Sequence, residues 1–203
     1  FFLDRNQSIF GPSSDAVSNY IMSFKPTRHR LKFNCRNNSA TAELARILSG
    51  VETGIPRADG PSLEPMWYRD KNHEVRQISN QVKRWIAEGI KPNEIAILSH
   101  RRLKNSSLSE GFYGNVGYGL YEWESKNSRE LPPEDQITYC TTQSFKGLEA
   151  RMVIIAGIDY LTHPERPNMA AILHCAATRA PGVTVASISE ELREEFKARS
   201  ENI

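Results

Sequence analysis

The chain has 203 residues, of which 39% are hydrophobic and 25% charged, the ordinary composition of a folded globular domain rather than of a disordered, collagen-like or coiled-coil chain. Twenty-six basic and 24 acidic side chains leave a net charge of +2, so any nucleic-acid contact would need a local basic surface. The apolar stretches 152–158 and 169–177 are far shorter than the roughly 20 residues of a membrane span. Cys35, Cys140 and Cys175 show no C-x-x-C spacing, which favours a reducing compartment such as the cytoplasm.

The first half of the chain alternates between apolar strands and helical spacing. Ala42, Ala45 and Leu48 share one face of a helix that Asn38 can cap and Gly50 can end. In chain order the pattern predicts a helix over 15–24, a strand over 31–33, the helix over 39–49, a loop over 51–65, an extended segment over 65–68, a helix over 75–88 and a buried strand over 95–98.

The second half has one stretch without a clear period. Residues 103–133 are rich in glycine and aromatic side chains, which favours a glycine-rich connection or hairpin; no lysine follows that would make a phosphate loop. Beyond it the pattern predicts strands over 137–141, 153–156 and 183–186, a turn over 147–149, a helix over 168–178, and a last helix that Ser187 and Glu190 start as a capping box and that runs through Lys197.

Strands that alternate with helices in this way predict an α/β fold, in which helices cover both faces of a parallel sheet. The chain has no G-x-x-x-x-G-K-[ST] loop, no Asp-Glu pair after an apolar strand and no H-x-x-x-H spacing. We therefore expect neither a Walker phosphate loop nor a metal site within it. His174 and Cys175 are neighbours whose side chains diverge on a helix, which favours packing over catalysis.

Four polar segments follow predicted strands or precede predicted helices, where α/β proteins bind ligands and phosphates. Each has an ordinary alternative when it is taken singly, such as a surface arginine or a plain turn. The segments are D-R-N-Q-S-I-F at 4–10, F-N-C-R-N at 33–37, T-T-Q-S-F-K-G-L-E at 141–149 and A-A-T-R-A at 176–180.

Taken together and in order, the four segments resemble motifs III, IV, V and VI of superfamily 1 helicases of the UvrD/Rep type. The resemblance covers essentially the whole chain, and K-G-L-E and T-R-A are its most specific parts. It implies that residues 1–30 are the end of a first motor domain. It also implies that residues 31–203 are the second RecA-like domain, of the P-loop NTPase type, without a large inserted subdomain.

The resemblance also implies a role for each matching residue. Gln7, Arg36 and Arg179 would contact the γ-phosphate of ATP, and Gly147 and Glu149 would bind the nucleotide, with Glu149 on the ribose. The implied nucleic-acid contacts are Thr141, Gln143 and Lys146. The implied partners are ATP with Mg²⁺, whose metal ligands would lie upstream, single-stranded DNA with RNA not excluded, and the first motor domain in cis.

The chain departs from the family pattern within motifs IV and V. Cys35 stands where the family has a tyrosine that stacks on adenine, and Gln143 stands where it has a histidine. Two alternatives to an active motor are a degenerate RecA-like module that binds nucleic acid or protein without ATP turnover, and an unrelated complete nucleotide-binding enzyme, which the missing phosphate loop disfavours. The helicase interpretation predicts that Arg36, Glu149 and Arg179 line one edge of a single sheet, at the carboxyl ends of their strands.

Overall fold

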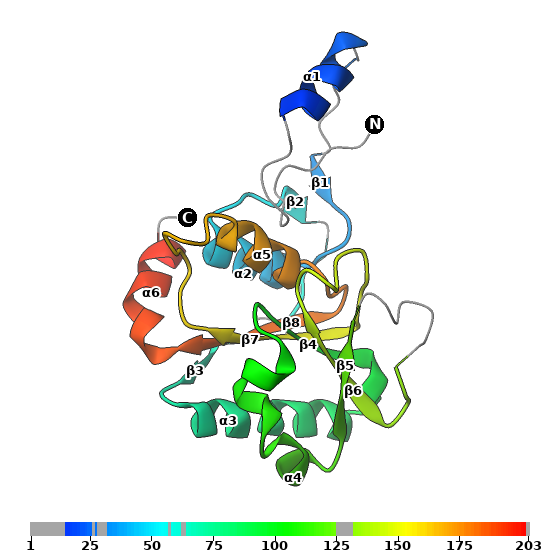
Figure 1. The fold of residues 1–203 in the computed structure, drawn as a ribbon, viewed down its shortest axis with the longest axis vertical. Coiled ribbons are helices and arrows are strands. Elements are labelled where there is room, and N and C mark those ends of the chain that lie inside the picture. Colours follow the sequence, from blue (N-terminus) through cyan, green and yellow to red (C-terminus); the bar gives the residue numbers. More distant parts are fainter. Residues whose placement is uncertain are drawn as a thin grey trace.

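A six-stranded sheet, parallel throughout, organises the protein (Figure 1). The computed structural model describes residues 15–25, 27, 32–56, 58–61, 64–124 and 132–201. In spatial order the strands are β3 (Met66–Tyr68), β8 (Val183–Ser189), β7 (Met152–Ile158), β4 (Ile95–Ser99), β6 (Gln136–Thr141) and β5 (Gly119–Trp123). Strands β4 and β7 at its centre are buried throughout, because helices cover both faces.

Helices lie on both sides of this sheet (Figure 1). One side carries α2 (Ser39–Ser49), α5 (Met169–Ala177) and α6 (Arg193–Glu201), and the other carries α3 (Lys71–Ala87) and the short α4 (Phe112–Val116). Each side has its own apolar core. The predicted fold class, α/β with a parallel sheet and helices on both faces, is confirmed.

The ends of α2 are those that the sequence predicts. The side chain of Asn38 accepts a hydrogen bond from the backbone N–H of Thr41 at 2.8 Å, and Gly50 adopts a left-handed conformation with φ of 69°. Helix α3 begins at Lys71, earlier than predicted, because Asp70 caps it by accepting from the N–H of His73 at 2.8 Å.

For residues 103–133 the sequence predicts a glycine-rich connection or a hairpin, and the hairpin is wrong. This stretch holds two 3₁₀ turns, Leu103–Asn105 and Ser107–Ser109, then α4 and the edge strand β5. Strand β5 pairs in parallel with β6, whereas the two strands of a hairpin are antiparallel. Four of the five residues of β5 are only partly buried or exposed, so no continuous apolar run marks the strand.

Two further expectations are wrong. Ser187 caps no helix, because it lies inside β8, fully buried, and its hydroxyl donates to a carboxylate of α3; a 3₁₀ turn at Glu190–Leu192 then precedes α6. The predicted loop over 51–65 contains β2 (Ile55–Pro56), which pairs in parallel with β1 (Phe33–Asn34) in a separate two-stranded sheet.

Helix α1 (Asp15–Ser23) is confirmed and stands away from the six-stranded sheet in Figure 1. Tyr20 and Phe24 are exposed there and contact each other edge to face at 5.1 Å between ring centroids. Gln7 and the rest of segment 4–10 lie outside the described residues. Within the described residues, no helix has the length and apolar character that crossing a membrane requires.

Candidate functional site

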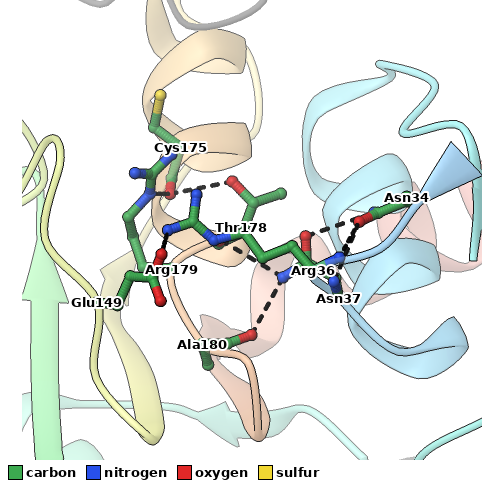
Figure 2. A network of polar contacts seen from close by, with 8 residues as sticks. All are labelled: Asn34, Arg36, Asn37, Glu149, Cys175, Thr178, Arg179 and Ala180. Carbon is green, nitrogen blue, oxygen red and sulfur yellow. Dashed lines mark hydrogen bonds and ion pairs between the residues drawn. The ribbon is translucent and has the colours of Figure 1, made fainter. Parts of the chain in front are cut away.

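Three residues of the predicted site meet in one group, which we call the arginine cluster: Arg36, Glu149 and Arg179 (Figure 2). Arg36 lies between β1 and α2, Glu149 in the loop before β7, and Arg179 just after α5. The guanidinium of Arg36 forms an ion pair with the carboxylate of Glu149. Segments more than 100 residues apart in sequence thus supply one charged group, as the motif resemblance implies.

Asparagine side chains hold the backbone of this cluster in place. The side-chain oxygen of Asn34 accepts hydrogen bonds from the backbone N–H groups of Arg36 at 3.1 Å and Asn37 at 3.0 Å. The amide of Asn37, which is 4% exposed, donates to the carbonyl oxygens of Thr178 at 3.4 Å and Ala180 at 3.1 Å (Figure 2). The segments that carry the two arginines are therefore tied together through main-chain carbonyls.

The two arginines of the cluster differ in exposure. Arg179 is only 3% exposed, and its Nε donates to the carbonyl oxygen of Cys175 at 2.9 Å. The side chain of Arg36 is 36% exposed. Partial burial lowers the pKa of Arg36, and the nearby positive charge of Arg179 lowers it further. The cluster thus holds two guanidinium groups and one carboxylate, a surplus of positive charge that suits an anion such as phosphate.

The cluster does not lie where the sequence predicts. Backbone hydrogen bonds from Ala150 N to Arg179 O and from Val183 N to Arg151 O, both 3.3 Å, place it beside the first residues of β7 and β8. It therefore lies at the amino ends of these strands, and Arg36 follows a strand of the separate small sheet. The expected edge at the carboxyl ends is wrong, because the chain after β6 crosses the sheet before it reaches Glu149.

The residues that the resemblance assigns to nucleic-acid contacts lie at the other end of this loop, just after β6. Thr141 is the last residue of β6, at the carboxyl edge of the sheet, and Gln143 and the exposed Lys146 follow in the same turn. Phe145, buried in the core under α2 and α5, anchors the crossing. Gly147 has a φ of +92°, which favours glycine where the loop turns towards Glu149. One loop thus connects the two edges of the sheet.

A second polar group, missed in the sequence, lies at the carboxyl edge; we call it the carboxyl-edge network: Tyr68, Glu74, Arg101 and Asp159. Asp159 accepts a hydrogen bond from the Tyr68 hydroxyl and forms an ion pair with Arg101. The buried carboxylate of Glu74 accepts hydrogen bonds from Gly157 N at 2.7 Å, from the Ser187 hydroxyl at 3.0 Å and from the Ser107 hydroxyl at 2.6 Å.

The position of this network could have been predicted. Strands β4 and β7 are neighbours, but the chain leaves β4 towards β5 and leaves β7 towards β8, on opposite sides of the sheet. Such a switch point is where open α/β sheets form a crevice for ligands. Arg101 follows β4 and Asp159 follows β7, so the rule that marked the four polar segments applies to them equally.

His100 beside this network makes stability depend on pH. Burial, with Arg101 and Arg166, lowers the pKa of His100 from its ordinary 6.5 to about 4, although Asp159 opposes the shift. Below pH 6.5 the unfolded chain therefore binds a proton that the folded protein does not, so the free energy of unfolding falls as the pH drops towards 4.

We expect His100→Asn to reduce this loss. Urea unfolding of both proteins at pH 7 and pH 5 measures it: the unfolding midpoint of the wild type should fall more between the two pH values than that of the variant. Equal falls would show that another group causes the pH dependence.

By its fold, the protein is an α/β domain with an open, all-parallel sheet. It is similar to the crystal structure of the C-terminal domain of a possible DNA helicase from Lactobacillus plantarum WCFS1, with a TM-score of 0.56 and 14% identity over 77% of this chain and 87% of that chain. Residues 137–182 match the family described as the UvrD-like helicase C-terminal domain. No curated protein sequence matches the chain.

The family match confirms the resemblance drawn from the motifs. It spans the segment that carries Thr141, Glu149 and Arg179, whereas Arg36 lies outside it. Residues 137–182 are therefore similar to the UvrD-like helicase C-terminal domain.

Proposed function

We propose that the chain is the second motor domain of an ATP-dependent helicase or translocase that acts on single-stranded DNA. Arg36 and Arg179 would reach the γ-phosphate of an ATP molecule held mainly by a first motor domain, together with Gln7. Gly147 and Glu149 would complete the nucleotide contacts. Thr141, Gln143 and Lys146 would contact the nucleic-acid strand.

The observation that carries this proposal is the convergence of Arg36 and Arg179 in the arginine cluster, from two motifs 143 residues apart. Phosphoryl transfer spreads negative charge over the γ-phosphoryl oxygens, and an arginine supplied across a cleft stabilises that charge. A guanidinium can engage two of these oxygens with parallel hydrogen bonds. Asn37, which ties both arginine segments together, would keep their spacing fixed while the cleft opens and closes.

The loop from Thr141 to Glu149 supports a link between the two binding functions. It begins at the carboxyl edge, beside the proposed nucleic-acid contacts, and ends in the arginine cluster at the amino edge. Because Phe145 packs the middle of the loop into the core, a shift of that core would move both ends of the loop together. Nucleotide exchange would in this way change the contacts of Thr141, Gln143 and Lys146 with the nucleic acid.

The described residues suit a phosphate group better than a metal ion. Among them, no three His, Cys, Asp or Glu side chains are grouped so as to hold a metal. Mg²⁺, which would neutralise charge on the phosphates, would be held by the proposed first motor domain.

The proposal is tested by measuring ATP turnover with Mg²⁺ in two forms of the protein. We expect the full-length protein, with its first motor domain, to hydrolyse ATP faster when a single-stranded DNA oligonucleotide is added, and the isolated chain to show no turnover above buffer. If RNA but not DNA stimulated ATP turnover, the nucleic-acid substrate would be RNA instead of DNA. Binding of DNA without any turnover in the full-length protein would favour the binding module instead, and turnover by the isolated chain would contradict the proposed division of the site.

A further inference from the structure

The ion pair between Arg36 and Glu149 occupies the group that the proposed function assigns to phosphate. Arg36 directs its guanidinium at the Glu149 carboxylate, and the side chains of the pair are 36% and 52% exposed (Figure 2). The neighbouring guanidinium of Arg179 is buried against α5 and bonded through Nε to a carbonyl. Arg36 is therefore the more accessible arginine of this cluster for a dissolved anion, and its guanidinium is already paired with Glu149.

We propose that Glu149 is an internal competitor for the anion: its carboxylate occupies Arg36 until a phosphate chain displaces it. The inference rests on the proposed function, because it takes the arginine cluster as the phosphate site. It assigns Glu149 a role on Arg36 that is separate from any contact with ribose.

The backbone around the pair favours exchange by side-chain rotation alone. Asn34 fixes the main chain at Arg36, and Asn37 ties that turn to Thr178 and Ala180. The main chain beside Glu149 is held by the hydrogen bond from Ala150 N to Arg179 O. Since both ends are anchored, release of Arg36 requires new rotamers of two exposed side chains and no movement of a strand or helix.

The balance of charge favours displacement by a polyphosphate. An exposed ion pair contributes little to stability, because water screens it and two long side chains must be held in place. A phosphate offers several oxygens and more negative charge than one carboxylate, and a guanidinium binds it with two hydrogen bonds. The positive charge of Arg179, which already lowers the pKa of Arg36, also attracts the incoming anion. Pairing with Glu149 then weakens the apparent affinity by the fraction of molecules in which Arg36 is occupied.

The test uses sodium tripolyphosphate without Mg²⁺, a phosphate chain that has no ribose and no base. Calorimetric titration of this chain at low salt compares the wild type with Glu149→Gln, which keeps the size of the side chain and removes the competing charge. We expect the variant to bind tripolyphosphate roughly threefold or more tightly. Arg36→Gln should abolish measurable binding.

Glu94→Gln is the matched control, because Glu94 pairs with Arg151 as Glu149 pairs with Arg36, and the substitution changes the net charge equally. It should alter the affinity less than twofold. The competitor role is overturned if Glu149→Gln leaves the affinity unchanged or weakens it, if Glu94→Gln tightens binding equally, or if neither the wild type nor Glu149→Gln binds.

These results are independent of catalysis. If Arg36→Gln abolishes tripolyphosphate binding while Glu149→Gln has no effect, the competitor role of Glu149 is rejected and the proposed motor function is not. If the full-length protein shows no ATP turnover, the motor function is rejected and the titration still decides the role of Glu149.

Discussion

Replacing Arg179 by alanine in the full-length protein is expected to lower DNA-stimulated kcat for ATP by roughly 10³-fold or more, the range of an arginine that stabilises charge across a cleft. The guanidinium would contact the γ-phosphoryl group more strongly in the transition state than in bound ATP, so the nucleotide Kd should change much less. Steady-state turnover and nucleotide titration of the same preparations measure the two effects.

Two further variants show whether a loss at Arg179 is catalytic. Arg179→Lys should be nearly as inactive as Arg179→Ala, because an ammonium keeps the charge but cannot engage two oxygens with a planar fork. Arg151→Ala, in the same part of the chain, removes an exposed arginine that pairs with Glu94 and should leave turnover nearly normal. Similar losses of turnover at Arg151 and Arg179, or near-normal turnover of Arg179→Ala, would contradict the motor function. Such results would favour a RecA-like module that binds nucleic acid or protein without ATP turnover.

Because Arg179 is 3% exposed and bonded to the carbonyl oxygen of Cys175, its replacement also removes a buried contact. Urea unfolding must therefore accompany the kinetics. An Arg179→Lys protein that unfolds at a nearly normal urea concentration, yet has lost its turnover, separates the catalytic effect from a folding defect.

The parts of the fold that the sequence predicted are those where local chemistry and burial agree. Strands β4 and β7 are almost entirely apolar, as suits strands covered on both faces, and Asn38 and Gly50 end α2 through their own side-chain and backbone preferences. Strand β5 could not be found in this way, because an edge strand is only partly buried and its glycine-rich flank resembles a turn. Its parallel pairing depends on contacts with β6 that no local pattern encodes.

The sequence analysis predicted that Arg36, Glu149 and Arg179 lie together, which is confirmed, but it placed them at the wrong edge of the sheet. The motifs brought Arg36, Glu149 and Arg179 together correctly, while the rule for strand ends put them at the wrong edge. That rule assumes that a polar residue stays near the strand it follows, whereas the loop after β6 crosses a whole face before it reaches Glu149. Ser187 was misassigned for a related reason, since only the fold reveals that its hydroxyl meets the carboxylate of Glu74.

Glu74→Leu is expected to lower the free energy of unfolding by about 2–4 kcal/mol, because it leaves buried partners without an acceptor. Glu74 is 4% exposed and accepts hydrogen bonds from Gly157 N and from the Ser187 hydroxyl, which joins α3 to β7 and β8. Gly157 has a φ of +72° at an irregular point between β7 and β8, so this acceptor also fixes the chain that leads to Asp159. Urea unfolding at pH 7 measures the loss.

Glu74→Gln should cost far less than Glu74→Leu, because the amide oxygen still accepts from Gly157 and the amide N–H can donate to a serine hydroxyl. Burial raises the pKa of Glu74, so the folded protein holds its proton to a higher pH than the unfolded chain does, and ionisation weakens stability as the pH rises through that pKa. Glutamine removes this cost.

Glu88→Leu, an exposed position at the end of the same helix, should change the unfolding free energy by less than about 0.5 kcal/mol. If glutamine at position 74 proved as harmful as leucine, the carboxylate charge rather than its hydrogen bonds would hold the carboxyl edge together.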